Sequence, residues 1–281
     1  MDNNTNLLLQ IQSSFNQLTK VEKKVASFVM ENTEQVLYMS ITDLADACNV
    51  GDTSVYRFCR TMNLEGYQEF KVQLSLCLAG QDSTEHAEKT ASPQNLAEFV
   101  MQLNIKAIQA TCQLLDREAL QRVVAMIENA RKVYFFGVGD SLLTAKEGFQ
   151  KFIRVTDKVC CIEDPHMQAI AAAMTTEEDL IIIVSYSGAT KDNILVAKEA
   201  KKAGAKLACI THYQKSILTA YADEILLCGA KESPLDGGSM AGKMGQLFLI
   251  DLLYQEYFHR NRKVCMQNRE KTAKAVNEKA Y

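Results

Sequence analysis

The sequence predicts an α + α/β protein in which an all-helical N-terminal domain precedes a doubly wound, five-stranded parallel sheet. Residues 7–78 carry apolar side chains at helical spacing, whereas from residue 94 short apolar runs alternate with helical patterns. Such an alternation favours parallel strands joined by right-handed helical crossovers. The polar residues 79–93 lack apolar periodicity, which is typical of a linker. We therefore expect one domain at 1–78 and a second at 94–281.

The first domain contains a helix start signal at Thr19, which lies three residues before Glu22. At this spacing the two side chains can each accept a hydrogen bond from the other residue's backbone N–H group, which forms a capping box. Apolar residues then recur every three or four positions, so a helix is expected to follow. Further helices are expected at 42–48, 53–61 and 67–78.

The second domain is expected to begin with two helices, at 95–115 and 117–129. The run at 180–184 is apolar on both faces and rich in β-branched residues, which is typical of a buried parallel strand. Strands are expected at 132–136, 158–162, 180–185, 206–210 and 224–227. Helices are expected at 141–155, 165–174, 190–203, 216–221 and 239–258, and a basic tail follows them.

The composition narrows the class of protein. No apolar run of the 281 residues approaches the roughly 20 residues that a membrane helix needs. The N-terminus lacks the positive flank of a signal peptide, and the nine cysteines show no paired spacing. We therefore expect a cytoplasmic protein with reduced thiols and no membrane contact, and nothing in the sequence indicates a metal or another cofactor.

Residues 40–60 have the layout of a helix-turn-helix motif. Leu44 and Ala45 would make the inner contact, while Val55 and Phe58 would seat the second helix. The opposite face would then enter the major groove of DNA, where hydroxyl and guanidinium groups contact phosphates and base edges. The predicted DNA-contacting residues are Thr42, Thr53, Ser54, Tyr56, Arg57 and Arg60, with Lys71 holding a backbone phosphate further out.

A helical module for dimerisation or protein binding is the alternative for this segment. The whole chain has a net charge of −3, and acidic residues outnumber basic ones within residues 1–80. Because non-specific affinity for DNA comes from neutralised phosphates, a single such domain would bind DNA weakly. DNA binding would therefore need two copies.

Two strand ends of the second domain carry hydroxyl side chains and glycines. Residues 137–141 follow the first expected strand, and residues 185–190 follow the third. The carboxyl ends of parallel strands border one crevice, where helix N-termini bind anions. Ordinary helix caps and turns are the alternative explanation. The residues predicted to bind a phosphate monoester are Gly139, Ser141, Ser185, Ser187, Gly188 and Thr190.

The first domain resembles the N-terminal domain of the RpiR family of bacterial transcriptional regulators. The resemblance rests on Leu18-Thr19, Ser40-Ile41, Leu44-Ala45, Ser54 to Arg60, Gly66-Tyr67 and Phe70-Lys71. Gly51 stands where the family usually has a serine; glycine is tolerated at this capping position, and Asp52 is a candidate substitute cap. Asn63 stands where the family has a glycine, and asparagine tolerates the left-handed turn expected there.

Residues 115–258 resemble the SIS (sugar isomerase) domain through the two loops and through Gly238-Ser239-Met240, Lys243 and Gln246 to Tyr254. The resemblance implies that this domain senses a phosphorylated sugar, with Ser239 and Lys243 near the sugar. It also implies a homodimer or homotetramer formed through the SIS domain. The whole chain would then be a DNA-binding regulator of sugar metabolism that binds a double-stranded operator.

An enzyme of the sugar-phosphate isomerase or lyase type is the main alternative, because SIS domains also occur in such enzymes. Their chemistry needs a positioned general base. The candidate bases are Glu163, His166, His212 and Glu232, and none of them forms a recognisable pair by spacing. An isomerase has no use for a helix-turn-helix domain, so no catalytic residue is expected. A protein-interaction module would bind neither DNA nor a sugar phosphate.

Overall fold

A computed structural model describes residues 7–81, 96–229 and 240–277 of the chain. The chain divides into two compact units, and the second unit begins at Asn104. Most of the predicted linker lies outside the described residues, but its first three residues continue a helix that ends at Gln81. Within the described residues, no helix is both long and apolar enough to span a membrane.

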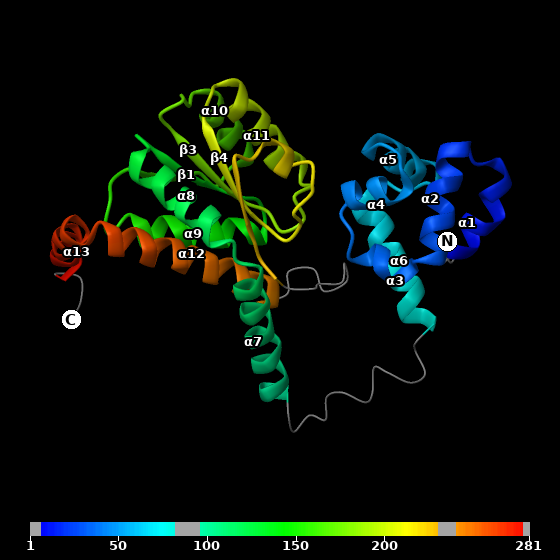
Figure 1. Cartoon of the computed structure of the whole chain (residues 1–281), viewed down its shortest axis with the longest axis horizontal. Helices are drawn as coiled ribbons and strands as arrows, with labels where there is room; N and C mark the ends of the chain where they lie inside the picture. Colours follow the sequence, from blue (N-terminus) through cyan, green and yellow to red (C-terminus); the bar gives the residue numbers. More distant parts are fainter. Residues whose placement is uncertain (1–6, 82–95, 230–239, 278–281) are drawn as a thin grey trace. The chain divides into compact units, whose positions relative to one another are not determined.

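The first unit is helical (Figure 1). Ile11, Val25, Leu44, Phe58 and Phe70 are completely buried and form its centre. The capping box at Thr19 is present, with both of its hydrogen bonds. Its elements are α1 (Leu7–Ser14), η1 (Phe15–Gln17), α2 (Lys20–Glu31), α3 (Thr33–Leu37), α4 (Ile41–Cys48), α5 (Asp52–Thr61) and α6 (Tyr67–Gln81).

The second unit contains a parallel sheet in the order β2-β1-β3-β4-β5. Its first strand therefore lies between the second and third, and the chain changes direction at this point. Ligands of open α/β sheets bind beside such a switch point. The strands are β1 (Val133–Phe136), β2 (Val159–Cys161), β3 (Leu180–Val184), β4 (Lys206–Thr211) and β5 (Glu224–Leu227).

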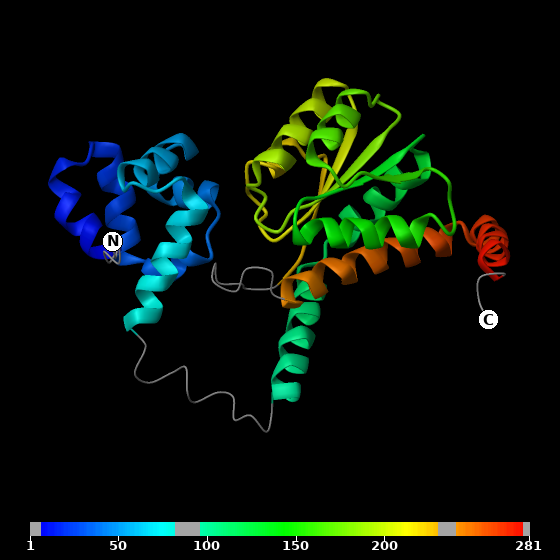
Figure 2. The same cartoon turned by 180° about the vertical axis from the view of Figure 1, so that it is seen from behind.

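Helices cover both faces of the sheet (Figure 2). On one face, Phe135 packs with residues of α8, α9 and α12, while on the other Phe136 packs with residues of α10 and α11. The helices of this unit are the part of α7 (Leu96–Leu114) from Asn104 onward, α8 (Arg117–Asn129), α9 (Asp140–Phe152), α10 (Pro165–Ala173), α11 (Lys191–Lys202), α12 (Met240–Arg260) and α13 (Arg262–Asn277).

The helix predicted at 216–221 is wrong, because only a 3-10 turn, η3 (Thr219–Tyr221), forms there. Two hydroxyl side chains accept hydrogen bonds from the local backbone N–H groups. The Ser216 N–H group donates to Thr219 Oγ1 at 2.7 Å, and the Thr219 N–H group donates to Ser216 Oγ at 3.2 Å. Such local bonds compete with a regular helix.

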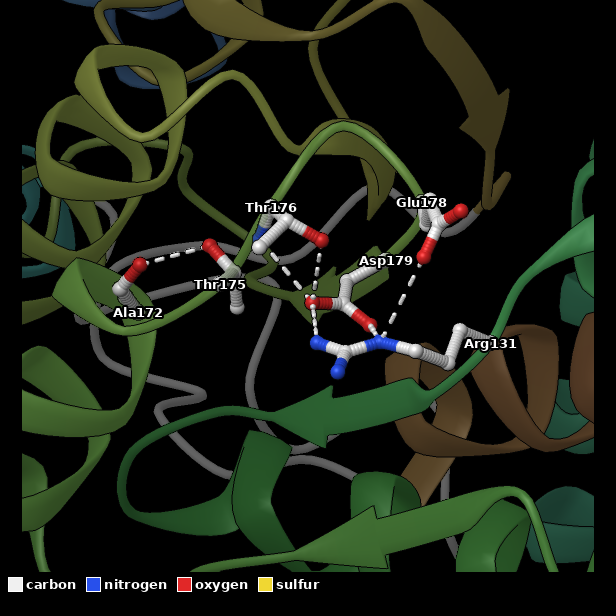
Figure 3. Close-up of polar contacts among 6 residues, drawn as sticks. All are labelled: Arg131, Ala172, Thr175, Thr176, Glu178 and Asp179. Atoms are coloured by element: carbon white, nitrogen blue, oxygen red, sulfur yellow. Dashed lines mark hydrogen bonds and ion pairs between the residues drawn. The ribbon is translucent and has the colours of Figure 1, made fainter.

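An ion pair joins the amino ends of β1 and β3 (Figure 3). The predicted phosphate loops follow the opposite, carboxyl ends of the same strands. The Arg131 guanidinium donates from Nε to Asp179 Oδ1 at 3.1 Å and from Nη2 to Oδ2 at 2.7 Å. Thr176 adds donors from its N–H and hydroxyl groups. Burial alone would raise the pKa of Asp179, but these hydrogen bonds outweigh it and lower the pKa below its usual value. The charged pair therefore joins the segments that lead into β1 and β3.

Candidate functional site

The loop after β3 brings hydroxyl groups to the start of α11. Ser185 is 2% exposed, and its Oγ atom has no hydrogen-bond partner among the described residues. Ser187 Oγ accepts a hydrogen bond from the N–H group of Ala189 at 3.3 Å. Thr190 occupies the N-cap position of α11, yet its side chain makes no capping bond there. The loop therefore offers a buried hydroxyl and an uncapped helix start to an anion.

Gly188 has a φ of +59° and is buried beside Ser216. A Cβ atom at this position would collide with the Ser216 side chain, and L residues other than Asn and Asp seldom adopt this φ. The Gly188 carbonyl accepts a hydrogen bond from the N–H group of Leu218 at 3.0 Å. Only glycine therefore fits this position of the loop.

The loop after β1 has two glycines with different constraints. A Cβ atom at Gly137 would lie 2.9 Å from the carbonyl oxygen of Ser141, so the loop closes tightly onto the first turn of α9. Gly139 is the N-cap of α9 at φ 60° and ψ −132°, a conformation that favours glycine, with open space beside it. Because β1 and β3 are paired neighbours, this loop and the Ser185–Thr190 loop leave adjacent strand ends.

Lys243 points from the first turn of α12 to the first residue of α9. Its Nζ atom lies 3.2 Å from Asp140 Oδ1. One turn later, the Thr144 hydroxyl donates to Gln246 Oε1 at 3.1 Å. The structure therefore places Lys243 beside the β1 loop, whereas Ser239, the other residue predicted near the sugar, lies outside the described residues.

Two further polar side chains near these loops were missed by sequence reasoning. Gln168 is fully buried, and its amide donates to the carbonyls of Gly137 at 3.0 Å and Ile162 at 2.7 Å. Asn193 is 2% exposed and shares the buried face of α11 with Val196 and Ala197. The side-chain oxygens of Gln168 and Asn193 have no partner among the described residues. A polar residue in an apolar stripe was the available signal for Asn193.

The candidate general bases are held in other ways or lie at the surface. Glu163 forms an ion pair of 2.6 Å with Lys146. The His212 ring stacks on Tyr186, with centroids 4.9 Å apart, and its Nδ1 atom lies 2.9 Å from the carbonyl oxygen of Cys228. His166 is exposed in the first turn of α10. Glu232 lies outside the described residues.

In the first unit, α5 presents the predicted recognition face to solvent. Thr53, Tyr56, Arg57 and Arg60 are exposed, and Ser54 is half-buried. The Arg60 guanidinium donates to the carbonyl of Leu64 at 3.4 Å, so its stem is held along the end of the helix. The helix thus carries two guanidinium groups on one outer face.

Thr42 and Asp52 form a contact between the two helices of the motif. The Thr42 hydroxyl donates to Asp52 Oδ2 at 3.0 Å. Asp52 is the first residue of α5, while Gly51 occupies the N-cap without a side-chain bond. The candidate cap Asp52 therefore does not cap α5, because its carboxylate accepts a hydrogen bond from Thr42 of α4 instead.

The prediction that Lys71 holds a DNA phosphate is also wrong. Lys71 is 5% exposed, and its ammonium group donates to the carbonyls of Leu37 at 3.1 Å and Met39 at 3.3 Å. Burial lowers the pKa of Lys71 to about 8. The side chain therefore joins α6 to the end of α3 and the segment that follows it, and its ammonium group is buried within the first unit.

Each of the two units matches a known protein family. The family model of the rpiR-type helix-turn-helix domain matches residues 5–81, and that of the SIS domain matches residues 126–255. The chain is 32% identical to an HTH-type transcriptional regulator of Haemophilus influenzae over 97% of each chain. It is 34% identical to the HTH-type transcriptional regulator HexR of Pseudomonas aeruginosa over 73% of each.

Solved structures of similar fold agree with these family matches. The Vibrio vulnificus NanR protein, complexed with ManNAc-6P, superposes with a TM-score of 0.88 and 29% identity, covering 98% of this chain and 100% of NanR. The sugar isomerase domain of an RpiR transcription factor from Sphaerobacter thermophilus, at 20% identity and a TM-score of 0.59, shares the fold over 64% of this chain and 99% of its own. The chain belongs to the RpiR family of helix-turn-helix transcriptional regulators.

Proposed function

We propose that this regulator of sugar metabolism binds a phosphorylated sugar between the β1 and β3 loops and thereby changes its affinity for DNA. The observation that carries the proposal is the buried Ser185 hydroxyl, which lacks a partner among the described residues beside the start of α11. Leaving such a group unsatisfied costs about 1–3 kcal/mol. A phosphate oxygen would satisfy it, and backbone N–H groups at a helix start favour the same anion.

The remaining loop residues have complementary roles in this proposal. The hydroxyls of Ser141, Ser187 and Thr190 donate to phosphate oxygens, while Gly139 and Gly188 let the backbone approach the anion closely. Lys243 and Ser239 contact the sugar. Lys243 is already beside the β1 loop through Asp140, so a short movement of its ammonium group would reach a ligand there. The complex of NanR with ManNAc-6P supports a phosphosugar as the ligand class.

The DNA-binding part of the proposal rests on the outer face of α5. Arg57 and Arg60, with Thr53, Ser54 and Tyr56, contact the major groove of a double-stranded operator. Thr42 supports this face through Asp52. A homodimer or homotetramer formed through the SIS domain (94–281) would present two helix-turn-helix domains (1–78) to a two-fold operator. Two copies also raise the affinity of a domain in which acidic residues outnumber basic ones.

A sensor is preferred to an isomerase because the described candidate bases are engaged or peripheral. The Glu163 carboxylate is neutralised by Lys146, and His212 is held by Tyr186 and Cys228. The relatives of this chain are named transcriptional regulators, which favours the same assignment. Incubation with hexose and pentose phosphates should therefore yield no isomerised product, and measurable turnover would restore the enzyme alternative.

A thermal-shift screen of the full chain tests the ligand proposal. The panel contains hexose phosphates, N-acetylhexosamine phosphates, pentose phosphates, the same sugars without phosphate, and inorganic phosphate. A ligand present at 100 times its Kd adds about 2.7 kcal/mol to the free energy of unfolding, so a true ligand raises Tm clearly. At least one phosphosugar should raise Tm while its parent sugar does not. A panel without any such hit contradicts the proposal.

A further inference from the structure

Helix α7 is the first described helix after the predicted linker, and it is therefore the described helix of the second unit that lies nearest in the chain to the DNA-binding domain. Its C-terminal half packs in the second unit, where Ala107 contacts Ala241 at the start of α12. Thr111, one turn further, is fully buried. Thr111 therefore lies in the half of α7 that packs against the rest of the second unit.

The Thr111 hydroxyl makes two hydrogen bonds that connect α7 to the end of β5. It donates to the carbonyl of Ala107 at 2.7 Å and accepts from the N–H group of Gly229 at 2.9 Å. The two backbones are also in close contact. A Cβ atom at Gly229 would lie 2.5 Å from the backbone of Ala110, and one at Gly245 would lie 2.6 Å from Thr111 Oγ1. A shift at Gly229 therefore cannot be absorbed by empty space at α7.

The segment that follows β5, Cys228 and Gly229, is connected back to the phosphate loop by two peptide groups. The Thr211–His212 peptide donates its N–H group to the Tyr186 carbonyl at 3.0 Å and accepts from the Cys228 N–H group at 2.9 Å. The Thr211 hydroxyl adds a second donor to the Tyr186 carbonyl at 3.1 Å. Tyr186 itself lies between Ser185 and Ser187, two of the serines of the proposed phosphate site.

The second peptide group completes the connection. The Cys228 carbonyl faces His212 Nδ1 at 2.9 Å, and the N–H group of the same planar Cys228–Gly229 peptide donates to Thr111. A rotation of this peptide plane would alter both bonds together. Hydrogen bonds and the covalent backbone of Cys228 thus connect Tyr186 to α7 through buried or half-buried groups.

We propose that Thr111 is the residue that couples the phosphate loop to α7, so that a phosphosugar held by Ser185 and Ser187 changes DNA affinity through it. The inference rests on the proposed function and specifies how the site acts at a distance. A ligand that fixes the backbone on both sides of Tyr186 favours one orientation of the connected peptides and hence one seating of α7. The ligand can change DNA binding only to the extent that its affinities for the two positions of α7 differ.

Thr111→Val tests the coupling, because valine keeps the shape of threonine and removes its hydroxyl. The DNA affinity of the full chain is measured by fluorescence anisotropy on a duplex selected from random sequences, with and without N-acetylmannosamine 6-phosphate or inorganic phosphate. In the wild type the ligand should change the Kd for DNA about fivefold or more. In Thr111→Val the change should fall below about twofold, while direct titration still shows ligand binding.

Two matched variants separate coupling from packing. Thr111→Ser keeps the hydroxyl and should retain the ligand response. Thr175→Val removes another buried hydroxyl, which donates to the Ala172 carbonyl at 2.6 Å at the opposite sheet edge, and should also retain it (Figure 3). A full ligand response in Thr111→Val, or an equal loss in Thr175→Val, overturns the coupling role alone. Where neither probe binds, the phosphosugar that raises Tm most in the thermal-shift screen replaces them, and a screen without any such hit overturns the phosphate site and the inference with it.

Discussion

Lys243 and Asp140 are paired at 3.2 Å across the first turns of α12 and α9, directly beside the glycine loop that follows β1. Asp140 is half exposed, whereas the Lys243 side chain is largely covered. A pair of this kind contributes little to stability. Its importance is positional, because it holds an ammonium group at the edge of the proposed phosphosugar site.

Lys243→Met should therefore weaken binding of the phosphosugar without unfolding the protein. We expect a loss of about tenfold in affinity for the phosphosugar, close to one charge-assisted hydrogen bond, and a smaller change for inorganic phosphate. Calorimetric titration with both ligands measures the difference. Asp140→Asn serves as the control that removes the pair but keeps the ammonium group. An unchanged phosphosugar affinity in Lys243→Met would remove Lys243 from the site.

Gly188→Ala should destabilise the second unit and abolish ligand binding, because alanine is strained at φ +59° and its Cβ atom meets Ser216. We expect a loss of about 2 kcal/mol or more in the free energy of unfolding. Adding Ser216→Ala should restore part of that loss, since the collision is removed and the strained φ remains. Gly139→Ala is the matched comparison with strain alone, because open space surrounds that position. Equal urea midpoints for Gly188→Ala and the wild type would contradict the steric argument.

Arg57→Ala should weaken DNA binding and leave phosphosugar binding intact, because Arg57 lies on the exposed face of α5 in the first unit. If Arg57 contacts a base, the free energy of DNA binding should weaken by about 1–3 kcal/mol. If it contacts the DNA backbone, the slope of log K against log salt concentration should fall by about one. Gel-shift titrations at two salt concentrations distinguish these cases. Arg117→Ala, an exposed arginine on α8, should have no effect. Unchanged affinity in Arg57→Ala would count against α5 as the recognition helix.

Lys71 should make the stability of the first unit increase with pH. Its pKa is lowered from 10.5 to about 8 by burial, so between these values the unfolded chain binds a proton that the folded chain lacks. Unfolding then takes up a proton, and the free energy of unfolding rises with pH by at most about 3 kcal/mol. Lys71→Met should lose this rise. Urea unfolding of both proteins at pH 7.5 and pH 10 measures the difference, and parallel pH profiles would show that Lys71 titrates normally.

The strands were predictable because their apolar, β-branched runs end at polar turn residues. Both ends of each of the five strands lie within one residue of their predicted positions, and β5 has the predicted bounds. The two loops were predictable for the same reason, since the parallel pairing of β1 and β3 places their ends side by side. The five-residue helix α3 was missed because a single turn offers no periodicity.

Other features depend on tertiary packing that the sequence does not display. A helical pattern marks Lys71 as a residue of α6 but does not reveal that α6 turns this position to the carbonyls of Leu37 and Met39. Gln168 and Asn193 are buried because α10 and α11 cover one face of the sheet. The role of Thr111 depends on contact with Gly229, which is 118 residues away in the chain.

The central claim is that the Ser185–Thr190 loop binds the phosphate group of a sugar effector. Its most direct test is calorimetric titration of the full chain and of Ser187→Ala with the phosphosugar that raises Tm most, and with the same sugar lacking phosphate. The wild type should bind the phosphosugar at least about 100-fold more tightly than the parent sugar, and Ser187→Ala should lose most of that preference. Equal binding of the two sugars, or an unchanged preference in Ser187→Ala, would contradict the account.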